Sequence, residues 1–234
     1  MKRILLKLSG EALRGDLKDD LYDHALVDRV AEAVCQSARE GYEIALVVGA
    51  GNIWRGRSSG AMDRTDADRM GMLATVINAL CLKDAIVRAG VEAVVMTSVP
   101  MAPFALPYRA EDAVAHLEAG RVVIFGAGLG IPFLSTDTTC AVRAAEIAAD
   151  AILMAKNVDY IYTADPNVKG SGAKRLENVK ASTVLALNLK AIDATATAFC
   201  LSTGMTIRVF GLKDPEDIVK AVRGEKVGTV VIPE

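Results

Sequence analysis

What the 234-residue sequence lacks excludes several classes of protein. It has no excess of basic residues, since the formal net charge is −2, so we expect no nucleic-acid partner. Its two histidines, His24 and His116, stand apart, and its four cysteines form no Cys-x-x-Cys pair, so we expect neither structural zinc nor disulfide bonds. Gly-Lys-Ser and Gly-Lys-Thr do not occur, which excludes a P-loop nucleotide site.

Signals for membranes and secretion are also lacking. We find no apolar run of about 18 residues, the length that a membrane-spanning helix needs. Lys2 and Arg3 lead straight into the apolar run Ile4–Leu8, which has the length of a strand and is followed by no small-residue cleavage site. This pattern predicts a first core strand rather than a secretory signal. We therefore expect a cytoplasmic protein without a membrane partner.

Short runs rich in β-branched residues alternate with longer segments of helical periodicity. The predicted strands are Ile4–Leu8, Ile44–Val48, Ala93–Thr97, Val122–Phe125, Ala151–Met154, Thr206–Phe210 and Thr229–Ile232. The predicted helices are Leu26–Arg39, Asp66–Ala89, Ala110–Glu118, Asp137–Ala149, Ile192–Ser202 and Pro215–Val222. Such alternation is typical of a mostly parallel sheet covered on both faces. We therefore predict an α/β protein with a three-layer α/β/α sandwich.

A soft boundary follows the fifth of these strands, Ala151–Met154. Val158–Thr163 alternates irregularly and ends in the turn residues Ala164–Asn167, which predicts a hairpin. We expect the chain after this hairpin to complete the same sheet on its other side, within a single domain.

The segment Asp66–Ala89 is apolar on nearly all sides of the predicted helix. Residues such as Met70, Leu73, Ile77 and Leu80 leave it little polar face. A helix of this kind is buried on more than one side. Two interpretations are equally open, a central core helix or a helix with one side in a subunit interface.

Three predicted strands end in glycine turns, and ligands in open α/β sheets lie beyond the carboxyl ends of strands. The first turn is Lys7–Glu11. Lys7 ends an otherwise apolar strand, a costly place for a cation without an anionic partner, and Ser9 and Gly10 can offer backbone N–H groups to the same anion. The alternative is a lysine that reaches solvent from an edge strand.

The second and third turns also suit anions. Gly49 and Gly51 allow close backbone approach, and Arg55 offers bidentate recognition of phosphate, whereas we expect Trp54 to serve packing. The third turn, Gly126–Asp137, leads into a predicted helix whose N-terminus suits a phosphate. Its Thr136 and Asp137 are equally open to a plain N-cap role. Its glycines run G-x-G-x-G, which is not the dinucleotide fingerprint.

Together these motifs resemble those of the bacterial uridylate kinases, in the amino-acid kinase family. The resemblance covers nearly the whole chain. It includes Lys2–Ala12, Gly49–Gly56, Met70–Val76, Ser135–Asp137, Thr163–Pro166, Gly224–Lys226 and Gly228–Thr229. The implied fold is a single amino-acid kinase domain, with an acceptor-binding part over about residues 1–150 and an ATP-binding part over about residues 151–234.

The resemblance implies an enzyme that moves the γ-phosphoryl group of ATP onto UMP in pyrimidine biosynthesis. The implied catalytic residues are Lys7, Arg55 and Asp137. The implied ATP-binding residues are Lys7, Leu8, Ser9, Gly10, Gly51, Arg55, Lys156, Asn157, Tyr162 and Asp165. The implied UMP-binding residues are Ala50, Asp68, Leu129, Gly130, Ile131, Pro132, Phe133, Leu134, Ser135 and Thr136.

The resemblance also implies partners. Mg²⁺ would arrive with ATP, without a metal site of the protein's own. The chain would form a homohexamer, a trimer of dimers, with GTP as an activator and UTP as an inhibitor. We further hypothesise that Lys7 and Arg55 flank the transferring phosphoryl group while Asp137 orients the lysine.

The sequence departs from the family pattern at two places that matter for function. Leu129 and Ile131 stand where the family has polar side chains near the base, so we expect uracil to be read by backbone groups. The loop Asp16–Leu21 is acidic and would repel a triphosphate, which argues against activation by GTP.

Two rival functions remain open. One is another family activity that phosphorylates a carboxylate or a carbamate. The other is a non-catalytic nucleotide-binding or storage protein, against which the joint presence of Lys7, Arg55 and Asp137 argues.

Overall fold

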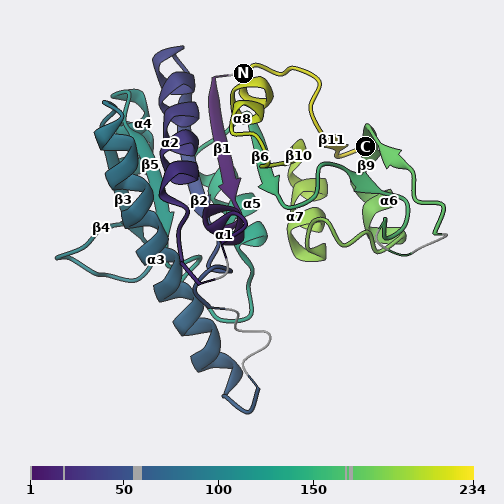
Figure 1. Cartoon of the computed structure of the whole chain (residues 1–234), viewed down its shortest axis with the longest axis horizontal. Helices are drawn as coiled ribbons and strands as arrows, with labels where there is room; N and C mark the ends of the chain where they lie inside the picture. The colour runs from purple at the N-terminus through teal and green to yellow at the C-terminus, as the bar shows by residue number, and fades with distance from the viewer. Residues whose placement is uncertain (1, 18, 55–59, 167, 169–170) are drawn as a thin grey trace.

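The computed structural model describes residues 2–17, 19–54, 60–166, 168 and 171–234. Among these, nine strands form one sheet in the order β4-β3-β5-β2-β1-β6-β10-β11-β9. Their bounds, in that order, are Leu106–Pro107, Ala93–Thr97, Val122–Gly126, Glu43–Val48, Arg3–Leu8, Ala151–Lys156, Ile207–Gly211, Thr229–Ile232 and Asn178–Lys180. Figure 1 shows this order from β3 and β5 at the left to β9 and β11 at the right.

The sheet is mostly parallel, as predicted. Each paired strand runs parallel to its neighbour except for β10 and β11, which are antiparallel. Parallel strands are buried on both faces and need continuous apolar runs, which is why these segments were recognisable from sequence. The sheet also joins the parts of the chain before and after the predicted boundary, because β6 and β10 extend it beyond β1.

Helices cover both faces, which confirms the three-layer arrangement. On one face pack α1 (Gly10–Arg14), α2 (His24–Arg39), α3 (Arg64–Arg88) and α8 (Glu216–Val222). On the other face pack α4 (Ala110–Glu118), α5 (Thr136–Glu146), α6 (Ala181–Ala186) and α7 (Ala194–Thr203). In β1, Ile4, Leu6 and Leu8 belong to the first core and Leu5 to the second. Because side chains alternate along a strand, Lys7 lies on the face of Leu5, toward α5.

The predicted hairpin is present, and several short elements escaped prediction. β7 (Ile161–Tyr162) pairs antiparallel with β8 (Arg175–Leu176). The elements α1, β4, β9 and α6 have at most six residues each, too few to show a periodicity. The helix expected to run to Ala149 ends at Glu146, and Ala148 has φ +51°, outside the helical region.

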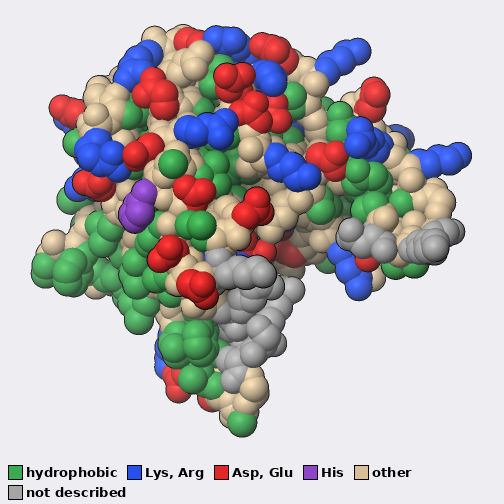
Figure 2. All heavy atoms as spheres, in the orientation of Figure 1, with side chains coloured by type: hydrophobic (Ala, Val, Ile, Leu, Met, Phe, Trp, Pro, Cys, Tyr) green, Lys and Arg blue, Asp and Glu red, His purple; other side chains and the backbone are tan. Residues whose placement is uncertain are grey.

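The long helix α3 is a core helix on one side, as the first of the two interpretations predicted. One side, including Ala74, Ala79, Leu82 and Ile86, is buried against the sheet and α2. On the other side its large apolar residues stay exposed, namely Met70, Leu73, Ile77 and Val87. Figure 2 shows apolar side chains gathered over the lower part of α3 and near β4. The helix therefore serves the core on one side and leaves an apolar surface on the other.

By length and composition α3 is also apolar enough to cross a membrane, although its sequence has no uninterrupted apolar run of that length. It passes because only two charged residues, Lys83 and Asp84, interrupt the apolar stretch Met70–Val87. Of this apolar window, 44% is buried inside the fold.

Candidate functional site

The centre of the site is a buried cluster of two lysines and one aspartate. Lys7 Nζ lies 3.3 Å from Asp137 Oδ1, and Lys156 Nζ lies 2.5 Å from Asp137 Oδ2. Lys7 comes from β1, Lys156 from the end of the neighbouring strand β6, and Asp137 from the first turn of α5. Since β1 lies in the middle of the sheet, the interpretation of Lys7 as a lysine on an edge strand is wrong.

The pKa values of Asp137 and Lys156 both depend on the neighbouring charges. Burial by itself would raise the pKa of Asp137, but attraction to Lys7 and Lys156 holds it below its usual value. Burial lowers the pKa of Lys156, and Asp137 partly offsets this effect. The two ammonium groups thus share one carboxylate, an arrangement that a bound anion would complete.

The N-terminus of α5 is capped by Ser135, not by Thr136 or Asp137. The Ser135 hydroxyl accepts hydrogen bonds from the backbone N–H groups of Asp137, at 3.0 Å, and Thr138, at 3.2 Å. Because Ser135 fills the capping role, the Asp137 carboxylate is available to the lysines. The structure therefore decides the question that the sequence left open about Asp137.

A second aspartate, absent from the sequence-predicted set, fixes this helix start. The Asp193 carboxylate accepts from the Ser135 hydroxyl and, at 3.1 Å, from the Thr138 hydroxyl. It also caps α7 by accepting from Ala196 N at 2.8 Å. The predicted helix Ile192–Ser202 placed Asp193 inside the helix, whereas α7 begins at Ala194, so the sequence did not identify Asp193 as its cap. Nothing local linked Asp193 to residues more than 50 positions earlier.

The first two glycine turns lie against each other. A Cβ atom on Gly10 would lie 2.4 Å from Gly49 O and 2.8 Å from Gly51 N, so only glycine fits there. Behind the second turn, Asn78 of α3 donates to Gly49 O at 2.7 Å and to Asn52 Oδ1 at 2.8 Å. Asn78 is fully buried and was not anticipated from sequence. Arg55, a predicted catalytic residue, lies outside the described residues.

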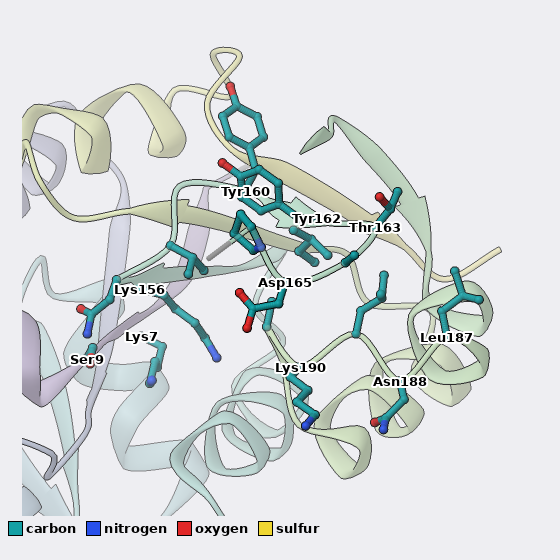
Figure 3. A pocket seen from close by; sticks show the side chains of 17 residues that line it. Lys7, Ser9, Lys156, Tyr160, Tyr162, Thr163, Asp165, Leu187, Asn188 and Lys190 are labelled. Atoms are coloured by element: carbon teal, nitrogen blue, oxygen red, sulfur yellow. The ribbon is translucent and has the colours of Figure 1, made fainter. Parts of the chain in front are cut away.

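A large cavity of about 550 Å³ opens beside the cluster. It falls within the range of about 300–1,000 Å³ that is typical of small-molecule sites. Six predicted ATP-binding residues line it, namely Lys7, Ser9, Lys156, Asn157, Tyr162 and Asp165. Figure 3 shows Lys7 and Lys156 at one end and Leu187 and Asn188 at the other, with Asp165 between. The lining segment 187–191, which follows α6, was not predicted.

Three predicted ATP-binding residues of the described chain, Leu8, Gly10 and Gly51, do not line this cavity. Leu8 has its side chain fully buried in the core, and its carbonyl accepts from Gly49 N at 2.9 Å. Gly10 and Gly51 belong to the packed pair of turns. Their roles at a bound nucleotide stay predictions.

A smaller cavity of about 170 Å³ lies at the start of α5. Among the predicted UMP-binding residues it is lined by Ala50, Asp68, Leu134, Ser135 and Thr136. It is also lined by residues that the sequence analysis did not select for binding, including Trp54, Arg64, Thr75, Gly128 and Thr139. The sequence signal for Arg64 was its spacing of four residues, one helical turn, from Asp68. In the structure its Nε donates to Asp68 Oδ1 at 2.9 Å.

The remaining predicted UMP-binding residues, Leu129, Gly130, Ile131, Pro132 and Phe133, lie outside the lining of the smaller cavity. Ile131 and Phe133 are exposed, at 59% and 62%. Phe133 is nevertheless tied to the cavity, since its backbone N–H donates to Asp68 Oδ2 at 2.8 Å. The roles of these five residues stay predictions.

The arrangement suits the transfer of an anionic group between two bound molecules. The larger cavity reaches Lys7 and Lys156, and the smaller one reaches Ser135 and Thr136, next to Asp137. In the described part of the chain, no three His, Cys, Asp or Glu side chains come together in a way that could hold a metal ion.

Comparison with known proteins shows which family the chain belongs to. The model of the amino acid kinase family matches residues 2–211. The chain belongs to the amino acid kinase family.

Solved structures of family members are similar over the full length. A UMP kinase from Bacillus anthracis has 35% sequence identity and a TM-score of 0.94, covering 100% of this chain and 96% of that one. A UMP kinase from Ureaplasma parvum has 34% identity and a TM-score of 0.92, covering 99% and 98%. A uridylate kinase from Archaeoglobus fulgidus has 26% identity and a TM-score of 0.75, covering 99% and 100%.

Proposed function

We propose that this protein is a UMP kinase, which transfers the γ-phosphoryl group of ATP to UMP and gives UDP and ADP. The observation that carries the proposal is the buried Lys7–Asp137–Lys156 cluster, whose two lysines line the larger cavity and whose aspartate directly follows Ser135 and Thr136 of the smaller one. Two structures that resemble this chain over nearly their whole length, at 34% and 35% identity, are UMP kinases. ATP would occupy the larger cavity and UMP the smaller one.

The proposed mechanism relies on position and electrostatics. Phosphoryl transfer spreads negative charge over the non-bridging oxygens and needs the attacking and leaving oxygens in line. Lys7 and Lys156 would face this charge at the end of the larger cavity, and Asp137 would hold both ammonium groups in place. Arg55 would contact the same phosphoryl group from the second turn. A UMP phosphate oxygen is already anionic, so the reaction needs no general base.

The start of α5 would steady the acceptor phosphate. Ser135 and Thr136 line the smaller cavity at this helix N-terminus, where free N–H groups and the helix dipole favour anions. Asp68, held by Arg64, would accept from a ribose hydroxyl of UMP.

Mg²⁺ would be held by ATP and water rather than by side chains of the cluster. The polar groups at the cluster are two lysines and a carboxylate that both lysines engage, so the phosphate oxygens and water would hold the ion. When bound, it would neutralise charge on the phosphates.

We further propose that the chain forms a homohexamer built as a trimer of dimers, in the cytoplasm, for pyrimidine biosynthesis. The exposed apolar side of α3 would be buried in the dimer interface. UTP would inhibit the enzyme, and the acidic loop Asp16–Leu21 would leave GTP with little effect as an activator.

A coupled ADP-release assay tests the function. ATP and Mg²⁺ are supplied with UMP, CMP, AMP or GMP, and we expect turnover with UMP alone. Equal turnover with CMP would keep the kinase activity and refute selectivity for uracil. ATP binding without turnover of any monophosphate would refute the proposal and favour a nucleotide-binding protein or a different acceptor.

A further inference from the structure

A buried arginine lies close to the third glycine turn, Gly126–Asp137, and lines neither cavity. Arg143 of α5 is only 5% exposed, and its Nη2 donates to Ser98 Oγ at 2.8 Å. Its guanidinium carbon lies 3.6 Å from the centre of the Tyr108 ring, and Nη1 pairs with Glu146. Tyr108 in turn donates to Glu146 Oε2 at 2.7 Å. The charge is thus compensated, although Nε has no hydrogen-bond partner among the described residues.

The hydrogen bonds from Arg143 have a fixed direction. A guanidinium group can only donate, so Ser98 Oγ must accept from Arg143. The single hydroxyl proton of Ser98 is then left for the Gly128 carbonyl oxygen, 2.5 Å away. The result is a one-way chain from Arg143 through Ser98 to the backbone of Gly128, and a charged donor strengthens such a chain.

The chain ends on a backbone segment that needs support. Ala127 and Gly128 both have positive φ, +61° and +56°, and Gly128 lines the smaller cavity. An alanine at positive φ persists only where its surroundings hold it. Ala127 N donates to the Thr75 hydroxyl at 2.9 Å, so hydroxyl groups from α3 and from the end of β3 fix consecutive residues of the turn. A Cβ on Gly130 would lie 3.2 Å from Ser98 Cβ, so Ser98 also sets how closely the turn packs.

We propose that Arg143 is a positioning residue for the acceptor site and acts through Ser98. By fixing the Gly128 carbonyl, the pair would hold the turn in the shape that receives the acceptor nucleotide. This inference rests on the proposed UMP kinase function. The larger cavity is lined by other segments, so a loosened turn would weaken binding of UMP and leave binding of ATP unchanged.

Three variants separate this role from general stability. Ser98→Ala removes the hydroxyl, and Arg143→Lys keeps the charge but loses the planar fork. Ser37→Ala is the matched control, because Ser37 is also buried and its hydroxyl donates to Ala33 O at 2.9 Å within α2. We expect the first two to raise the KM for UMP about three- to tenfold, the effect of one net hydrogen bond, with the KM for ATP and kcat within about twofold of wild type. Ser37→Ala should leave all three constants unchanged.

The double variant tests whether Arg143 acts through Ser98. If it does, Ser98→Ala/Arg143→Lys should have the KM for UMP of Ser98→Ala alone, whereas independent effects would multiply. Two results for Ser98→Ala would overturn the inference, namely an unchanged KM for UMP, or equal rises in the KM for UMP and the KM for ATP. Both tests remain valid even if Arg143→Lys folds poorly. A wild-type protein inactive with UMP would refute the proposed function and this inference with it. An active wild type with an unaffected Ser98→Ala refutes only this inference.

Discussion

Replacing Asp137 by asparagine removes one charge from the centre of the site and changes almost no volume. Its oxygens lie 3.3 and 2.5 Å from the Lys7 and Lys156 ammonium groups, and the three side chains are at most 16% exposed. Removing one partner of a buried ion pair costs about 3–5 kcal/mol in unfolding free energy. For a chain of this length that lowers Tm by roughly 6–20 °C.

The same substitution should separate catalysis from binding. Without the carboxylate the two lysines repel each other and leave their positions, and one lost preorganised contact reduces kcat by about 10²–10³-fold. The ATP phosphates can still neutralise both ammonium groups, so the KM for ATP should not rise. ATP should also stabilise the variant at least as much as wild type, since ligand binding adds to stability.

Steady-state kinetics and thermal unfolding with and without ATP check these expectations. Asp150→Asn is the matched control, because Asp150 also has a lowered pKa, from backbone N–H groups of Lys2 and Arg3, far from the cluster. Near-normal kcat in Asp137→Asn would refute the role of the carboxylate. A raised KM for ATP with unchanged kcat would show that the cluster only binds the donor.

The pH dependence follows from the directions of the two pKa shifts. The pKa of Asp137 is lowered in the folded state, so its stabilising contribution is present above the unfolded value of about 3.9 and is lost as pH falls through the folded value. The pKa of Lys156 is also lowered, so the cost of burying its charge is relieved as pH rises through the folded value. In Asp137→Asn this lysine loses its partner, and the alkaline limb of the activity profile should move to lower pH.

Three further variants test other parts of the site and its surface. Lys7→Ala should reduce kcat by about 10²–10³-fold, and near-normal turnover would show that Lys7 is not catalytic. Gly10→Ala would place a Cβ 2.4 Å from Gly49 O, so we expect lower stability and reduced activity together, whereas an unaffected enzyme would contradict the close packing of the turns. Ile77→Asp, on the exposed side of α3, should dissociate the proposed dimer in size-exclusion chromatography with light scattering, and an unchanged mass would move the interface elsewhere.

Much of the fold and part of the site were readable from local patterns. Buried parallel strands need continuous apolar runs, and glycine marks the tight turns that follow three of them. These rules located the seven main strands, the six longer helices and all three glycine turns. Lys7 stood out because a lysine at the end of an apolar run requires an anionic partner.

Other features depended on contacts between distant segments. Lys156 meets Asp137 because β6 pairs with β1, and strand order arises from long-range packing that no short window contains. The partnership of Asp193 with Ser135, and that of Arg143 with Ser98, likewise join residues 45 or more positions apart. Short elements such as α6 and β9 exist because neighbouring strands and helices hold them.

The sequence by itself determined the α/β class, the turns and the identity of the charged residues, because each depends on the chemistry of neighbouring residues. The tertiary structure decided which of two possible roles a residue takes. Asp137 is a partner of lysines rather than a cap because Ser135 occupies the capping position, and Lys7 is central because strands lie on both sides of β1. Both outcomes depend on where other parts of the chain lie in space, which composition and spacing do not encode.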